Sequence, residues 1–167
     1  VTELSNRGRR QSIQQTTDDL ASKIAAGEQK SLPLFQELRK LDDSPLLAME
    51  VDKLICLNHG YRHILTVSHR WQAGEGNKRV YEPDKDGKQF QKVLQYVLDN
   101  EHVEYVWYDF WCLPQDTIDK PRTDQEDLEF GHMLREVNLL YMGTFVLILL
   151  DRSFISRFWT QFEAWLA

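Results

Sequence analysis

Hydrophobic positions in the second half of the chain follow two alternating patterns. Continuous aliphatic or aromatic runs, which are typical of buried β-strands, occupy 64–67, 103–113 and 144–150. Apolar residues at helical spacing follow each of these runs, over 89–100, 126–143 and 151–167. Strand and helix alternate three times, with strand centres about forty residues apart. This pattern predicts an α/β domain in which helices cover both faces of a parallel sheet of at least three strands.

The first sixty residues predict helices only. Residues 1–30 are polar with weak helical spacing, so a partly helical extension is expected there. Two amphipathic helices are predicted next, one from an N-cap at Ser31 to Leu41 and one from an N-cap at Ser44 to Gly60. The predicted parts of the chain are an extension at 1–30, a helical segment at 31–60 that packs on the core, and an α/β domain at 61–167.

Neither end of the chain is typical of a complete protein. The chain lacks an initiator Met and stops directly after the third predicted helix of the α/β pattern. An open α/β sheet normally continues at that point. We therefore expect either that the domain is incomplete at its C-terminus, or that the helices of 31–60 cover the edge where further strands would lie.

Composition narrows the functional classes. The 167 residues are 42% hydrophobic and 28% charged, with a net charge of −6, so no general basic field favours nucleic-acid binding. The longest apolar run, 145–150, is far shorter than the roughly 18 to 20 residues that a membrane span needs. No secretory signal is evident at the start. We expect a cytoplasmic domain without a membrane span, with Cys56 and Cys112 as free thiols.

Polar and aromatic residues gather where the predicted strands end. In parallel sheets, ligands bind at the carboxyl ends of the strands. These positions and those just beyond them hold Ser68, His69, Arg70, Trp71, Asp109 and Trp111. The tryptophan rings could stack on a ligand or pack beneath the loops, and the residues alone favour packing. The long segment from Gln72 to Lys88, rich in Gly, Pro and charge, predicts a loop beside this edge.

Two familiar kinds of site are not expected. A catalytic triad of Ser68, His69 and Asp109 is disfavoured because consecutive strand residues point to opposite faces, and no G-x-S-x-G motif surrounds the serine. A metal site at Cys56 and the two histidines that follow is also disfavoured, since no further Cys or acidic ligand lies close by. That stretch predicts the end of a helix and the start of a strand.

The last predicted helix carries one acid, Glu163, in an aromatic stretch. Its aromatic neighbours are Phe158, Trp159, Phe162 and Trp165. A carboxylate on or beside an inward-facing helical stripe is usually paired with a cation or part of a functional site. Glu163 fits both interpretations: it could stabilise a cation or transfer a proton at the strand ends, or it could pair with Arg70 or Arg157. The residues alone leave the two equally open.

Four stretches, in this order and at this spacing, resemble the motifs of one family. They are TVSHRW, VWYDFWCLPQ, MLREVNLLYMGTFVLIL and SRFWTQFE. Together they make about residues 61–166 resemble the TIR superfamily, most closely its heterokaryon-incompatibility (HET) branch. The resemblance implies a flavodoxin-like fold for the predicted sheet.

The resemblance also implies an activity. In enzymatic TIR domains, a glutamate on the corresponding helix cleaves the nicotinamide glycosidic bond of NAD, and by position this role falls on Glu163. The substrate-binding residues that it implies are Ser68, Arg70, Trp71, Asp109 and Trp111. The serine and the arginine would face ribose or phosphate, and a tryptophan would stack on a ring. NAD is then a substrate, and no bound cofactor is implied.

Two functional hypotheses follow. The first is a signalling domain in defence or cell death that binds a nicotinamide or adenine nucleotide and hydrolyses NAD with Glu163. The second is a non-catalytic module for protein–protein interaction or oligomerisation, or a subunit of a larger assembly, in which Glu163 is structural. The resemblance implies self-association or a partner protein, because TIR-like enzymes commonly build their active sites across copies.

Overall fold

The computed structural model describes residues 32–69, 84, 87–117, 120–150 and 158–167. The predicted extension at 1–30 and most of the predicted loop after the first strand lie outside these residues. The chain divides into two compact units, one of Val1–Leu32 with Asp84–Glu101 and one of Pro33–Pro83 with His102–Ala167. Each unit is described by itself below. The predicted division at residues 30 and 60 stays a prediction.

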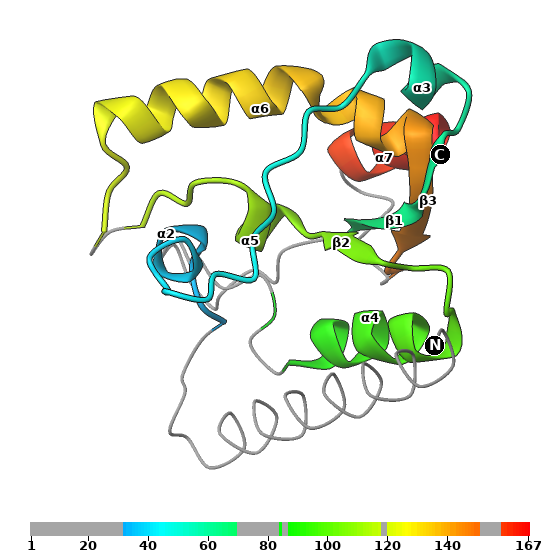
Figure 1. The fold of residues 1–167 in the computed structure, drawn as a ribbon, viewed down its shortest axis with the longest axis horizontal. Helices are drawn as coiled ribbons and strands as arrows, with labels where there is room; N and C mark the ends of the chain where they lie inside the picture. The colour runs from blue at the N-terminus through cyan, green and yellow to red at the C-terminus, as the bar shows by residue number, and fades with distance from the viewer. Residues whose placement is uncertain (1–31, 70–83, 85–86, 118–119, 151–157) are drawn as a thin grey trace. The chain divides into compact units, whose positions relative to one another are not determined.

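The second unit contains a parallel sheet of three strands (Figure 1). The strands are β1 (Tyr61–Ser68), β2 (Tyr105–Trp107) and β3 (Thr144–Ile148), in the spatial order β2-β1-β3. β1 pairs in parallel with both neighbours, and Leu65 lies opposite Val106 on one side and Phe145 on the other. This confirms the predicted α/β class and parallel sheet. The order also matches the start of a flavodoxin-like sheet.

β1 is the best-buried strand because it is central. Ile64, Leu65, Thr66, Val67 and Ser68 are all nearly or fully buried. A strand that is covered on both faces reads as a continuous apolar run rather than an alternating one, which explains the aliphatic stretch in its sequence. The hydroxyls of Thr66 and Thr144 lie 2.7 Å apart and satisfy each other inside the sheet.

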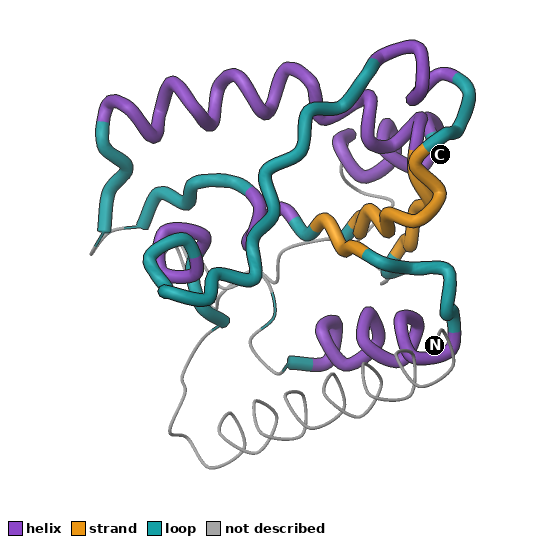
Figure 2. The backbone as a smooth tube through the Cα atoms, viewed as in Figure 1, coloured by secondary structure: helices purple, strands orange, loops and turns teal. Residues whose placement is uncertain are grey.

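Two helices of the second unit pack against this sheet (Figures 1 and 2). α6 (Asp124–Gly143) contacts β1 and β3, and α7 (Phe158–Leu166) contacts β1 and α6. α6 starts at a capping box, in which Thr123 and Glu126 each accept a backbone N–H of the other. It ends at Gly143, as the sequence predicts. Both predicted helices are confirmed over these residues.

The predicted helix from Ser44 to Gly60 is wrong over its first half. Residues 45–52 are not helical, and α3 spans only Lys53–Leu57. The Asp52 carboxylate is the actual N-cap, because it accepts the N–H groups of Leu54 and Ile55 at 2.8 and 3.0 Å. The end near Gly60 is confirmed: the preceding residue, His59, has a φ of 52°, and the Gly60 N–H donates to the Ile55 carbonyl.

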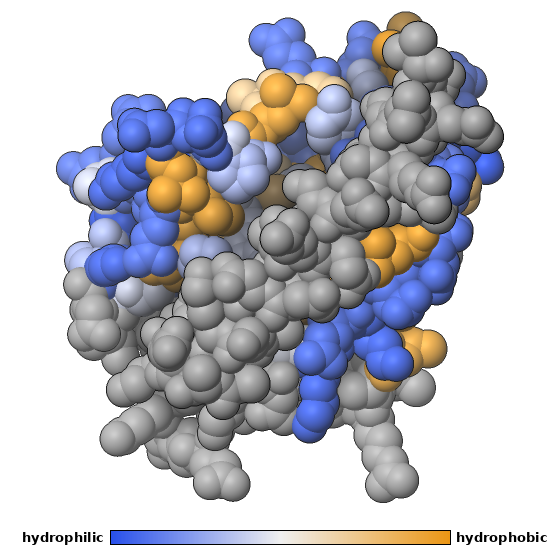
Figure 3. Space-filling view, turned by 60° about the horizontal axis from the view of Figure 1, so that its bottom comes forward, coloured by the Kyte–Doolittle hydropathy of each residue, from blue (hydrophilic) through white to orange (hydrophobic). Residues whose placement is uncertain are grey.

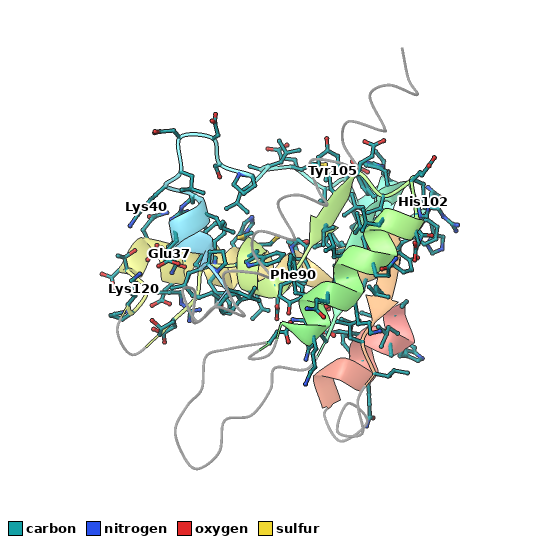
Figure 4. All side chains as sticks on the ribbon, turned by 90° about the horizontal axis from the view of Figure 1, so that it is seen from below. Glu37, Lys40, Phe90, His102, Tyr105 and Lys120 are labelled. Atoms are coloured by element: carbon teal, nitrogen blue, oxygen red, sulfur yellow. The ribbon has the colours of Figure 1, made fainter. Side chains whose placement is uncertain are left out.

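The helix predicted from Ser31 to Leu41 is also shorter than expected. α2 covers Phe35–Leu38, and its first free N–H group, that of Leu34, donates to the Glu37 carboxylate at 3.0 Å. That local bond makes Leu34 the N-cap of the helix, whereas Ser31 lies outside the described residues. Figure 4 shows Glu37 beside Lys120, with which it forms an ion pair.

The strand predicted over 103–113 is wrong in its second half. β2 ends at Trp107, and Asp109–Cys112 forms the single helical turn α5. The Asp109 carboxylate accepts the Phe110 N–H at 2.6 Å, and the Cys112 N–H donates to the Tyr108 carbonyl. Such a local bond competes with strand pairing. Aromatic composition alone does not distinguish a strand from a buried helical turn.

In the first unit, the helix predicted over 89–100 is confirmed as α4 (Lys88–Asp99). Gly87 precedes it with a φ of 65°, a left-handed conformation that favours glycine. The Asp84 carboxylate accepts the Phe90 N–H at 2.7 Å and so satisfies one of the free donors of the first turn. No helix among the described residues is long and apolar enough to cross a membrane.

Several apolar side chains of the second unit reach the surface. Leu54 of α3 and Leu128 of α6 are each 70% exposed, and Leu134 of α6 is 43% exposed. The space-filling view shows apolar residues at the surface among hydrophilic ones (Figure 3). α3 and α6 pack together, so these residues belong to neighbouring elements.

Candidate functional site

The site begins at the last residue of the central strand. Ser68 is fully buried, and its hydroxyl donates to Oε2 of Glu163 at 2.6 Å. Its carbonyl accepts the Leu149 N–H at 2.9 Å, which fixes the end of β1 beside the end of β3. The hydrogen bond to Glu163 joins residues 95 positions apart in the sequence. It places the acid of α7 at the carboxyl end of the sheet, where parallel folds bind ligands.

Glu163 is half-buried, and its surroundings act on its charge in opposite directions. Burial raises the pKa of Glu163, because loss of water disfavours the carboxylate, and the charge of Asp109 adds to this rise. Hydrogen bonds from Ser68 and Tyr141, together with the charge of His69, lower the pKa. The net shift is upward. Such balanced tuning is typical of acids that take part in chemistry.

Tyr141, near the end of α6, also acts on Glu163 and is almost completely buried. Its hydroxyl lowers the pKa of Glu163. Burial and the nearby charges of Glu163 and Asp109 raise the pKa of Tyr141, so the phenol keeps its proton. Groups from two elements, Ser68 of β1 and Tyr141 of α6, therefore favour the charged form of Glu163.

A second acid lies at the neighbouring strand end. The Nε2 atom of His69 is 2.8 Å from Oδ1 of Asp109, the first residue of α5. The His69 ring stacks on Tyr108, with centroids 4.3 Å apart and planes at 10°. The carbonyl of Asp109 accepts a hydrogen bond from Gln115. Asp109 is therefore held through both its side chain and its backbone.

The strand order explains why these groups meet. β1 lies between β2 and β3, so Asp109 arrives from one side, after β2, and Glu163 from the other, in the helix that follows β3. Two consecutive residues at the end of β1 each hold one of these acids: Ser68 binds Glu163 and His69 binds Asp109. Consecutive positions point to opposite sides of an extended chain, which allows this division.

Of the residues predicted for the site, three come together: Ser68, Asp109 and Glu163. Trp111 lies on α5, half-buried, with its ring 5.0 Å from that of Tyr108. Arg70, Trp71 and Arg157 lie outside the described residues, so neither the predicted contacts of Arg70 and Trp71 nor the alternative ion pairs of Glu163 are tested.

The structure agrees with the exclusion of a serine triad. His69 does contact Asp109, but the Ser68 hydroxyl is directed to Glu163. Sequence reasoning missed the role of His69 as the partner of Asp109, and it missed Tyr141 altogether. In sequence, Tyr141 is one more large residue on an apolar helix and carries no signal of a polar role.

The remaining ionisable groups suggest no further chemistry at this site. Cys56 and Cys112 are free thiols, and burial raises the pKa of Cys112 to about 11, so it is a poor nucleophile at neutral pH. Within the described residues, no group of three or more His, Cys, Asp and Glu side chains is arranged to hold a metal ion.

The arrangement suits the stabilisation of positive charge. A half-buried carboxylate that is held by the Ser68 hydroxyl stabilises a nearby cation without reorganising during a reaction. An acid with a raised pKa can also take up or release a proton during a reaction. Comparisons with profiles of known protein families, with curated proteins and with solved structures found no match.

Proposed function

We propose that this chain is a TIR/HET-like domain that hydrolyses NAD and releases nicotinamide, in defence or cell-death signalling. The observation that carries the proposal is the 2.6 Å hydrogen bond between Ser68 and Glu163, which holds an acid of raised pKa at the end of the central strand. The resemblance of the four sequence stretches gives Glu163 the same role. The two arguments are independent, because one concerns geometry and the other motifs.

The reaction requires one well-placed carboxylate. The bond between C1′ of ribose and the pyridinium nitrogen breaks, and its electron pair leaves with nicotinamide, which becomes neutral. The ribose then carries an oxocarbenium-like charge that Glu163 stabilises. Water adds to C1′ and loses a proton, giving ADP-ribose. Because the leaving group departs neutral, no acid is needed to protonate it.

In this proposal the other predicted residues support Glu163 or bind the substrate. Ser68 is fully buried, so it fixes Glu163 and acts on the ribose only through that acid. Asp109 offers a second carboxylate at the same edge of the sheet. The contacts of Arg70 with phosphate and of Trp71 or Trp111 with a ring rest on the resemblance.

The test is nicotinamide release from NAD by purified, concentrated protein. Glu163→Gln keeps the shape of the side chain and removes its charge, so release should fall by at least about 100-fold. Glu136→Gln is the matched control, since Glu136 is exposed on α6 and the same charge is removed away from the site. Release that is equal in the two variants would exclude Glu163 as the catalytic residue.

A second candidate function is a non-catalytic module that self-associates. Three large apolar side chains of the short helix α3, Leu54, Ile55 and Leu57, are 70%, 45% and 52% exposed, and exposed apolar residues that lie together often mark an interface. Sedimentation velocity of the wild type and of Leu54→Glu separates the two candidates. Oligomers that Leu54→Glu dissociates, in a protein that releases no nicotinamide, would support the module.

A further inference from the structure

His69 is a buried histidine for which the proposed reaction has no direct use. Its side chain is only 1% exposed, so it cannot touch a substrate. A buried imidazole needs hydrogen-bond partners and a fixed orientation. Here one ring face lies on Tyr108, and Nε2 meets the carboxylate of Asp109. The contact with Asp109 therefore links His69 to the site.

The Asp109 side chain is more exposed to solvent than that of His69. It is 31% exposed, and Oδ1 of its carboxylate is engaged. Oδ1 accepts from both His69 and the Phe110 N–H, and the Asp109 carbonyl accepts from Gln115. Of these three contacts, only that of His69 comes from another strand end. It ties Asp109 to the end of β1 and thus to the residue next to Ser68.

We propose that His69 is a positioning residue, which holds the Asp109 carboxylate at the carboxyl ends of β1 and β2 so that a second acid faces the site of Glu163. The catalytic part of this inference rests on the proposed function. The geometric part does not, since it concerns only where the Asp109 carboxylate is held.

The position of Asp109 matters to Glu163 through charge. Among the described residues, the groups that act on Glu163 are Ser68 and His69 at the end of β1, Asp109 on α5 and Tyr141 on α6. The charge of Asp109 raises the pKa of Glu163, and this effect depends on the distance between the two carboxylates. If His69 no longer holds Asp109, the carboxylate can turn towards solvent and its effect on Glu163 weakens.

Two substitutions separate hydrogen bonding from packing at His69. His69→Phe keeps a ring to stack on Tyr108 and removes the donor to Asp109. His69→Gln loses the ring but offers an amide N–H at about the place of Nε2. We expect kcat/KM for nicotinamide release to fall about 10- to 100-fold in His69→Phe, and to return close to the wild-type value in His69→Gln. Equal losses in both variants, or no loss in His69→Phe, would overturn the inference.

A titration of Glu163 tests the inference without relying on activity. In the full chain, carboxyl-carbon NMR reports the pKa of Glu163 in wild type, Asp109→Asn, His69→Phe and the double variant. Asp109→Asn should lower this pKa when His69 is present and change it much less in the His69→Phe background. Equal changes in both backgrounds would show that His69 does not hold Asp109.

These two measurements keep the proposals distinguishable. A protein that releases no nicotinamide but shows the coupling between His69 and Asp109 contradicts the proposed function and supports the positioning role. A protein that releases nicotinamide but lacks that coupling supports the proposed function and contradicts the positioning role. If His69→Phe does not fold, His69→Met, which also lacks the donor, takes its place in both measurements.

Discussion

Ser68→Ala gives the most direct test of how the site works. The substitution removes the 2.6 Å hydrogen bond that the Ser68 hydroxyl donates to Glu163. A hydrogen bond to a charged group contributes about 1.5 to 3 kcal/mol. If this bond acts fully in the transition state, its loss lowers kcat by about 10- to 150-fold, since each 1.36 kcal/mol is a factor of ten.

The same substitution should shift the pH dependence in a defined direction. The bond from Ser68 lowers the pKa of Glu163, so its loss raises that pKa further above the ordinary value. Glu163 stabilises a cation only as the carboxylate. The acidic limb of the kcat profile should therefore move to higher pH, and part of the lost activity should return as the pH is raised.

Thr66→Val is the matched control for Ser68→Ala. Thr66 lies on the same strand two residues earlier and is equally buried, but its hydroxyl bonds to Thr144 at 2.7 Å and not to Glu163. Thr66→Val should cost about 1 kcal/mol of stability and leave the pH profile in place. A Ser68→Ala variant that is slowed by less than about threefold, or whose pH profile matches that of Thr66→Val, would refute the reasoning.

Three further predictions concern stability and reactivity. Gly143→Ala should lower the free energy of unfolding by about 1–3 kcal/mol, because its Cβ would lie 2.7 Å from the Cα of Cys56. In urea denaturation Gly131→Ala is its control, since nothing lies within 4 Å and the change should stabilise α6 by about 0.5–1 kcal/mol. Glu163→Gln should raise the free energy of unfolding at about pH 7 but not at about pH 3. The pKa of Glu163 is raised in the folded protein, so its stabilising effect is complete below the unfolded-state pKa and is lost as the pH rises through the folded-state pKa. Equal effects of the substitution at both pH values would contradict this. The Cys112 thiol, with a pKa of about 11, should react with a maleimide far more slowly in the folded protein than in urea, and equal rates would contradict its burial.

Sequence periodicity predicts the regular parts of the fold because burial dictates their pattern. β1, α4 and α6 are long enough for several apolar residues to mark one buried face or a buried run. The predictions fail where a single side chain decides the backbone. At Asp52 one carboxylate accepts two nearby N–H groups and so starts α3, and at Asp109 the carboxylate accepts the N–H of the next residue inside the turn α5. Such local bonds do not alter the hydrophobic pattern, so periodicity cannot detect them.

The candidate site was only partly predictable for a different reason. Glu163 stands out as an acid among aromatic residues, and Ser68 stands out as a polar residue at a strand end. Their hydrogen bond depends on α7 returning to the end of β1, which no local pattern encodes. Tyr141 and His69 are harder still, because their polar atoms are buried in the core. Their roles appear only once their partners are placed in space.

The site and the register of the sheet depend on each other. Leu65 lies opposite Val106 and Phe145, and this register fixes which side of the strand end Ser68 and His69 each face. A slip of β1 by one residue would exchange the two faces, because side chains alternate along a strand. Ser68 would then point away from Glu163, and His69 away from Asp109, so both hydrogen bonds would be lost together. The hydrogen bond between the Thr66 and Thr144 hydroxyls opposes that slip, since a shifted strand would lose it. The residues that stabilise the sheet therefore also fix the positions of Glu163 and Asp109. A variant that loosens β1 should lose the hydrogen bonds of both acids before the sheet itself unfolds.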